Sequence, residues 1–142
     1  MYQKMISLIG NGNRGERAEN SVSLAFTGKE HKKDSVRFDK GSDIEELKMS
    51  VKSNHATLVS GGILKATEKQ AMINEYLDRD ASDKFAYVCD DGMTYIMNKD
   101  EFEKFINEFV TLDRDSKKNG GQIKLRLKAE SSKMRAWLES AI

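Results

Sequence analysis

Proline is absent from this 142-residue chain, and cysteine occurs only once, at Cys89. Without proline, the turns and helix ends must rely on Gly, Asn, Asp and Ser. A single cysteine cannot form an intramolecular disulfide, and Cys89 ends an apolar run, so we expect a buried structural thiol rather than a reactive one. The two histidines, His31 and His55, are isolated in the sequence, which argues against a zinc site.

Long apolar runs are missing as well. No segment approaches the ~20 apolar residues that a membrane span needs, and the first ten residues lack the pattern of a secretory signal. We therefore expect a cytoplasmic protein in a reducing compartment. Hydrophobic residues make up 38% and charged residues 33% of the chain. This is enough apolar material for one core, so residues 1–142 are predicted to form a single domain.

The net charge is only +1, but the charges are segregated along the chain. Between Arg114 and Arg135, eight basic residues stand against two acidic ones, a local charge of +6. Between Glu75 and Glu103, nine acidic residues stand against three basic ones, a local charge of −6. A basic face on a nearly neutral protein is typical of proteins that bind a polyanion. Solvated surfaces without a partner explain the segregation equally well.

Hydrophobic periodicity predicts both helices and strands. Apolar residues three and four positions apart predict helices at 16–26, from Thr67 onward, at 98–109 and from Ser131 or Ser132 onward. Alternating residues and an Asp-Gly turn predict strands within 35–38, 43–52, 85–89, 93–97 and 123–128. This order favours an α/β fold, mixed α+β, in which helices flank a central mixed β-sheet.

The segment Gly10–Gly15 is rich in glycine and asparagine and leads into the first predicted helix. Its composition is similar to that of a phosphate-binding loop. It lacks the Lys-Ser/Thr ending of a P-loop, however, and it follows only a short apolar run. The segment alone therefore predicts a loop rather than a nucleotide site.

The stretch from Gly41 to Ser53 carries the most informative polar pattern. Asp43 opens an apolar segment, and Lys52 follows nine residues later. On an extended backbone, Asp43 and Glu45 would project to one side, and Ser50 and Lys52 would share a face. Magnesium prefers oxygen ligands and is often held by one or two carboxylates beside a phosphate. A neighbouring lysine can orient the attacking water and neutralise charge that develops on the phosphate.

Three short motifs in this part of the chain resemble the ordered motifs of the PD-(D/E)xK nuclease superfamily, which includes restriction enzymes, junction resolvases and some homing endonucleases. They are Gly15-Glu-Arg-Ala-Glu19, Gly41-Ser-Asp43-Ile and Ser50-Val-Lys52-Ser. The resemblance covers about residues 15 to 53 and implies a restriction-endonuclease-like fold. It implies that Glu19 supports or binds the metal, that Asp43 is the central ligand of Mg²⁺ or Mn²⁺, and that Lys52 is the catalytic lysine.

The chain departs from the superfamily pattern at two positions. Ser42 replaces the proline before the aspartate, and Ser50 stands where the second acidic ligand is expected. Some restriction enzymes of the superfamily have serine there and supply the acid from elsewhere, so Glu45, Glu46 or Glu19 can substitute. The alternative acidic-x-Lys motif, Glu46-Leu-Lys48, lies too close to Asp43 for a separate strand. We therefore assign Ser50 and Lys52 to the catalytic motif, and we include Glu45 among the candidate metal ligands.

These features predict metal-dependent hydrolysis of double-stranded or branched DNA, or a DNA-binding protein derived from such a nuclease. The DNA phosphates would be bound by six basic residues: Arg14, Lys117, Lys118, Lys124, Arg126 and Lys128. A homodimer would allow both strands to be cut. The alternative is a small phage or plasmid accessory protein that binds a host protein, for example to inhibit a host defence enzyme, through the acidic run from Glu75 to Glu103.

Overall fold

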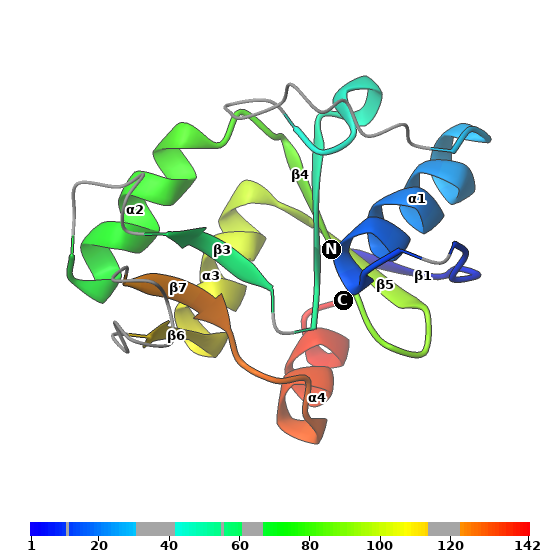
Figure 1. Cartoon of the computed structure of the whole chain (residues 1–142). Coiled ribbons are helices and arrows are strands. Elements are labelled where there is room, and N and C mark those ends of the chain that lie inside the picture. Colours follow the sequence, from blue (N-terminus) through cyan, green and yellow to red (C-terminus); the bar gives the residue numbers. More distant parts are fainter. Residues whose placement is uncertain (11, 31–41, 55, 61–66, 114–122) are drawn as a thin grey trace.

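The chain forms a mixed α/β fold with four α-helices and two β-sheets, seen in a computed structural model that describes residues 1–10, 12–30, 42–54, 56–60, 67–113 and 123–142 (Figure 1). The strands are β1 (Tyr2–Met5), β2 (Met49–Ser53), β3 (Thr57–Ser60), β4 (Lys84–Val88), β5 (Met93–Asn98), β6 (Val110–Asp113) and β7 (Lys124–Leu127). The helices are α1 (Arg14–Thr27), α2 (Lys69–Arg79), α3 (Lys99–Phe109) and α4 (Ser132–Ser140), with a short 3₁₀ helix, η1 (Glu45–Leu47).

The first sheet has the strand order β1-β5-β4-β2 and is mixed, as the sequence predicts. The β4–β5 pair is the expected antiparallel hairpin, and β1 adds to it antiparallel. Strand β2 pairs parallel to β4, with Ser50 opposite Phe85 and Lys52 opposite Tyr87. Since β2 is the last strand of this order among the described residues, one of its sides has no paired strand there and is called the free edge below. The candidate site lies on that edge.

A second, antiparallel sheet of three strands, β3-β7-β6, is a correction to the expected single central sheet. Strand β7 alternates as predicted: Leu125 and Leu127 are buried, whereas Lys124 and Arg126 lie on the outer face. In the register, Arg126 lies opposite Thr57 of β3 and Thr111 of β6. Strands β1, β3 and β6 were not expected. Each is only four residues long and, unlike β7 within the alternating segment 123–128, is not part of a longer alternating run.

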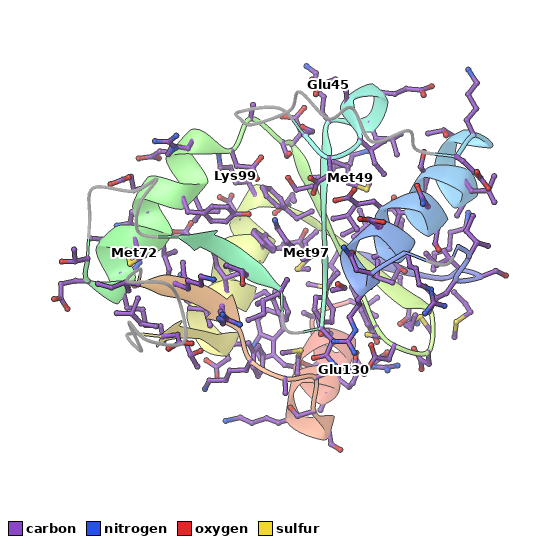
Figure 2. The ribbon with its side chains drawn as sticks, in the orientation of Figure 1. Glu45, Met49, Met72, Met97, Lys99 and Glu130 are labelled. Atoms are coloured by element: carbon purple, nitrogen blue, oxygen red, sulfur yellow. The ribbon has the colours of Figure 1, made fainter. Side chains whose placement is uncertain are left out.

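The first sheet separates two apolar clusters (Figure 2). On one face, α1 packs against residues such as Met49. This cluster consists of Ile6, Ala18, Val22, Ile44, Met49, Val51, Ala86, Val88 and Ile96. On the other face lie α2, α3, α4 and the second sheet, with Met72 and Met97 among the buried side chains. The successive strand residues point alternately into these clusters, because side chains alternate across a strand.

Cys89 belongs to the larger cluster and is 1% exposed, as its apolar surroundings predict. Burial raises the pKa of its thiol, and the Glu130 carboxylate raises it further. The thiol is therefore protonated at neutral pH and is a poor nucleophile. No helix within the described residues combines the length and the apolar character of a membrane span.

The stretch 43–52 is not one strand, which corrects the expectation from its alternating pattern. Residues 45–47 form η1, and Lys48 follows in a left-handed conformation with φ 48°. Ile44 then pairs antiparallel with Met49 in an isolated bridge. The chain therefore turns back on itself within five residues, and Glu45 does not continue an extended segment with Asp43. Alternation alone cannot reveal such a turn.

Two helix starts differ from the predicted ones. Helix α1 begins at Arg14 and is capped by Asn13, whose side chain accepts from the Glu16 N–H. Helix α2 begins at Lys69 rather than at Thr67, with Glu68 as its N-cap residue and no side-chain capping bond from Glu68. The strand expected at 35–38 lies outside the described residues. The start of α3 is confirmed: Asn98 and Glu101 form a reciprocal capping box.

Replacing Asn98 with alanine should lower the free energy of unfolding by about 1–2 kcal/mol, because the Glu101 N–H at the start of α3 loses its acceptor. Urea unfolding followed by circular dichroism measures this change. Asn107→Ala is the matched control, since Asn107 lies in the exposed interior of the same helix and should differ from wild type by less than about 0.5 kcal/mol. Equal losses in both variants would contradict the capping role.

Candidate functional site

A cavity of about 420 Å³ lies along the free edge of β2. It brings together the three residues that the sequence motifs single out: Glu19 from α1, Asp43 from the segment before η1, and Lys52 from β2. The remaining lining residues are Asn13, Arg14, Gly15, Val51, Ser53, Asn54, Ala56 and Thr57. Glu19 lies 24 positions before Asp43 and 33 before Lys52 in the sequence, and it shares one surface depression with them because α1 packs across the edge of the sheet.

Asp43 is held in place by the backbone of the edge strand. Its Oδ2 atom accepts a hydrogen bond from the Val51 N–H at 2.8 Å. Val51 belongs to an edge strand, and the Asp43 carboxylate takes up this outward N–H, which would otherwise lack a strand partner. The backbone bridge between Ile44 and Met49 keeps the two segments together. Asp43 is half-buried, so its carboxylate still borders the cavity.

Lys52 lies on the face of β2 that turns toward α2. Its Nζ atom lies 5.8 Å from the centroid of the Tyr76 ring, within the range of a cation–π contact. Burial by itself would lower the pKa of the Lys52 ammonium, but the Tyr76 hydroxyl and the Asp43 and Asp80 carboxylates outweigh it and raise this pKa above its ordinary value. Burial raises the pKa of Tyr76 to about 12. At neutral pH the lysine is therefore charged and the tyrosine neutral.

Ser50 stands where the resemblance leads one to expect an acid, and it contacts a carboxylate from another element. Its hydroxyl donates to Asp80 Oδ2 at 2.9 Å, and Asp80 Oδ1 accepts from the Ser82 N–H at 2.8 Å. Asp80 is the C-cap residue of α2. It does not line the cavity, but its charge acts on Lys52. The sequence analysis missed Asp80, because Asp80 and Ser50 are 30 residues apart and no local pattern indicates their contact. The only local signal is the Asp-x-Ser sequence at 80–82, which is typical of a turn.

Three buried serines extend this contact into a network. The Ser50 and Ser82 hydroxyls are 2.7 Å apart, and Ser82 donates to the Ser42 hydroxyl at 2.8 Å. All three side chains are buried. Ser42 precedes Asp43, and Ser50 is two residues before Lys52, so the network ties both site segments to the end of α2. Buried hydroxyls that satisfy one another in this way fix the relative position of the segments.

The other predicted ligands are placed differently. Glu19 is half-buried and lines the cavity. Glu45 is exposed on η1, at the periphery of the molecule in Figure 2, and does not line the cavity. Ser50 is buried and does not line it either. Within the described part of the chain, no group of three or more His, Cys, Asp and Glu side chains is arranged to hold a metal ion.

The two carboxylates of the cavity nevertheless suit Mg²⁺ or Mn²⁺. Magnesium keeps several of its waters and commonly takes only one or two protein carboxylates. Asp43 and Glu19 border the same cavity as the charged Lys52, so a cation held by both would have a lysine beside its water shell. The donor set is oxygen only, which suits a hard divalent cation rather than zinc.

The predicted phosphate-binding residues lie on two elements next to the cavity. Arg14 lines it, and its guanidinium donates to the Asn54 carbonyl at 3.3 Å. Lys124 and Arg126 lie on the outer face of β7, and Lys128 is exposed just beyond that strand. Thr57, the register partner of Arg126, also lines the cavity, so the outer face of the second sheet adjoins it. Arg126 Nε lies 3.6 Å from Asp113. Lys117 and Lys118 lie outside the described residues.

Comparisons with known proteins identify no relative. No family model, no curated protein and no solved structure matches this chain. The site must therefore be interpreted from its own geometry.

Removing the Ser50 hydroxyl should destabilise the protein. Ser50→Ala leaves the Asp80 carboxylate and the Ser82 hydroxyl each without one partner in a buried place, at a cost of about 1–2 kcal/mol in the free energy of unfolding. Urea denaturation measures the change. Ser7→Ala, at an exposed position, is the control and should be neutral. A Ser50→Ala variant as stable as wild type would mean that the serine network does not hold the site segments together.

Proposed function

We propose that this protein is a divalent-metal-dependent endonuclease that hydrolyses phosphodiester bonds in DNA. The observation that carries the proposal is the convergence of Glu19, Asp43 and Lys52 on one cavity. These residues come from separate parts of the chain and were singled out by motif order alone. Two carboxylates and a charged lysine around one depression are the groups that metal-assisted phosphodiester hydrolysis requires.

In this mechanism Asp43 and Glu19 would hold Mg²⁺ or Mn²⁺, which when bound would supply Lewis-acid polarisation of the phosphate and a more acidic water. Asp43 is oriented by the Val51 N–H, which leaves its second carboxylate oxygen available to the cavity. Lys52 keeps its positive charge because the Asp43 and Asp80 carboxylates lie nearby, so its ammonium neutralises charge that grows on the phosphate oxygens.

The basic residues around the cavity bind the rest of the DNA backbone. Arg14 lies at the rim, and its planar guanidinium suits bidentate contacts to a phosphate. From Thr57 the DNA passes onto the outer face of β7, where Lys124 and Arg126 contact further phosphates. Lys128, exposed just beyond β7, extends this surface, and Lys117 and Lys118 stay predicted phosphate contacts outside the described residues. A homodimer would place two such sites on the two strands.

The host-protein alternative has less support from the geometry. The acidic run from Glu75 to Glu103 is divided among α2, the β4–β5 hairpin and α3. Several of its carboxylates have partners within the chain: Asp80 accepts from Ser50, Asp91 from Arg135, and Glu101 from the Asn98 N–H. Because these carboxylates form intramolecular hydrogen bonds, the run does not form one continuous acidic surface that is available to a partner protein.

A nicking assay on supercoiled plasmid tests the proposal. Asp43→Asn is the sharpest variant, because its amide oxygen can still accept from the Val51 N–H while the metal-binding charge is lost. We expect cleavage with Mg²⁺ or Mn²⁺, none with a chelator, and a loss of about 100-fold or more in Asp43→Asn and in Lys52→Met.

Asp78→Asn and Lys104→Met are the matched controls, since both residues are exposed on helices away from the cavity, and both should cleave like wild type. Circular dichroism verifies that each variant is folded. Cleavage that persists in Asp43→Asn, or that needs no metal, would refute the site assignment. A protein that binds plasmid without cutting it under any of these conditions would instead be a nuclease-derived binding protein.

DNA binding should depend steeply on salt through the outer face of β7. The double variant Lys124→Gln, Arg126→Gln should reduce the slope of log binding constant against log salt concentration by about 2, since each neutralised phosphate contributes about 0.9. Fluorescence anisotropy with a labelled duplex, in the presence of a chelator, measures this slope. Lys69→Gln together with Lys104→Gln removes the same amount of charge elsewhere and should leave the slope closer to wild type. An equal change in both double variants would mean that β7 is not the binding face.

A further inference from the structure

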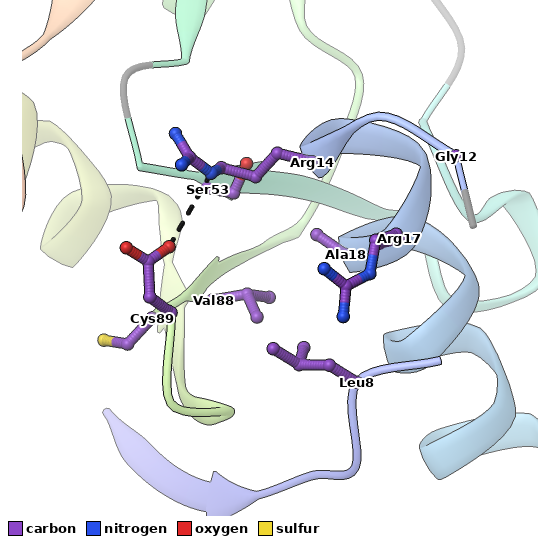
Figure 3. A pocket seen from close by; sticks show the side chains of 9 residues that line it. Leu8, Gly12, Arg14, Arg17, Ala18, Ser53, Val88 and Cys89 are labelled. Atoms are coloured by element: carbon purple, nitrogen blue, oxygen red, sulfur yellow. Dashed lines mark ion pairs between the residues drawn. The ribbon is translucent and has the colours of Figure 1, made fainter. Parts of the chain in front are cut away.

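A second cavity, of about 360 Å³, adjoins the candidate metal site (Figure 3). The two cavities share Arg14 and Ser53. The first turns of α1 form the ridge between them: Gly15 and Glu19 face the metal site, whereas Arg17 and Ala18 face the second cavity. Its volume lies within the range of small-molecule sites, roughly 300–1,000 Å³.

The walls of the second cavity combine one basic side with one apolar side. Figure 3 shows Arg14 and Arg17 on the α1 side and the aliphatic side chains of Leu8 and Val88 across from them. Ala18 adds to the apolar part. Gly12, from the glycine-rich segment 10–15, also lines the cavity. The segment 10–15 therefore borders both cavities: Asn13, Arg14 and Gly15 line the candidate metal site, and Gly12 and Arg14 line the second cavity.

The two arginines differ in the intramolecular partners of their guanidinium groups. Arg14 Nε lies 3.7 Å from Asp90 Oδ1, and both side chains are 52% exposed, so this ion pair is weak and can rearrange. For Arg17, no hydrogen-bond or ion-pair partner of the guanidinium is found among the described residues, and its side chain extends into the cavity in Figure 3. Five N–H donors of one arginine are therefore available to a ligand.

We propose that this cavity binds the nucleotide that adjoins the scissile phosphate, an inference that rests on the proposed endonuclease function. The guanidinium of Arg17, assisted by Arg14, binds the phosphate of that nucleotide. Its base lies against Leu8 and Val88, and Asp90 accepts a hydrogen bond from an exocyclic amino group. Because Arg14 and Ser53 belong to both cavities, one DNA strand can occupy them with consecutive nucleotides.

The shape of the cavity also specifies the form of the substrate. A base that sits between α1 and the end of β4 has protein on its faces, so it has left the stack of its own strand. Extruding a base from an intact duplex costs a few kcal/mol, and the cost is smaller for an unpaired nucleotide. The substrate is therefore DNA with an unpaired nucleotide beside the cut, such as a branched or frayed end, in preference to a fully paired duplex.

Deoxyadenosine 5′-monophosphate is the probe for this cavity, titrated into the ¹⁵N-labelled full chain and followed by amide chemical shifts. We expect shifts centred on Leu8, Gly12 and Val88, and weaker binding of deoxyadenosine and of inorganic phosphate, each of which has only half of the recognised groups. Arg17→Ala should weaken binding by about tenfold or more, with Arg17→Lys in between. Arg17 is exposed, so these variants should fold, and Lys69→Ala is the control.

Several results would overturn the proposal: no shift at about 10 mM of the nucleotide, shifts that map elsewhere, equal affinity in Arg17→Ala, or inorganic phosphate binding as tightly as the nucleotide. Its failure is distinguishable from failure of the endonuclease proposal. Metal-dependent nicking without nucleotide binding would refute the nucleotide site but support the endonuclease proposal. Nucleotide binding that depends on Arg17, without nicking by any preparation, would support the nucleotide site but refute the endonuclease proposal.

Discussion

The hydrogen bond from the Val51 N–H to the Asp43 carboxylate determines the geometry of the candidate site. Strand β2 is bonded on one side to β4, and the other side is a free edge with outward backbone groups. Exposed edges of this kind are normally covered or paired. Here the cover is a side chain carboxylate and a tight turn. The Asp43 carboxylate thus accepts the hydrogen bond from the strand edge and also borders the cavity. The same side chain serves the fold and the candidate site.

Around that bond, polar groups are arranged in two layers. The cavity layer holds Glu19, Asp43 and Lys52, which are half-buried and reach solvent. Behind it, Ser50 and Asp80 are joined by hydrogen bonds to two further buried serines. The inner layer does not line the cavity, but it fixes the strand that carries Lys52, and Asp80 adds negative charge near the Lys52 ammonium. Such support is what keeps a reactive constellation within a few tenths of an ångström of its working geometry.

Helix α1 separates the candidate site from the second cavity. Its N-terminal turns place carboxylate and guanidinium groups on different faces, because residues three or four positions apart project in similar directions, whereas residues two apart, such as Arg17 and Glu19, do not. Negative charge on one side suits a cation, and positive charge on the other suits a phosphate. The first turns of α1 therefore separate the two kinds of charge that the proposed metal ion and DNA strand would require.

Local periodicity and turn residues are enough to predict the mixed α/β class, the hairpin at Asp91-Gly92, the start of α3 and the two faces of β7. Motif order also selected Glu19, Asp43 and Lys52. The three-dimensional fold was needed to show that these three residues share one cavity, that Glu45 lies outside it on η1, and that Asp80 contacts Ser50. The parallel pairing of β2 with β4 and the packing of α1 over the sheet edge bring these residues together. Contacts between residues dozens of positions apart produce no periodicity in the sequence, so they could not be predicted from it.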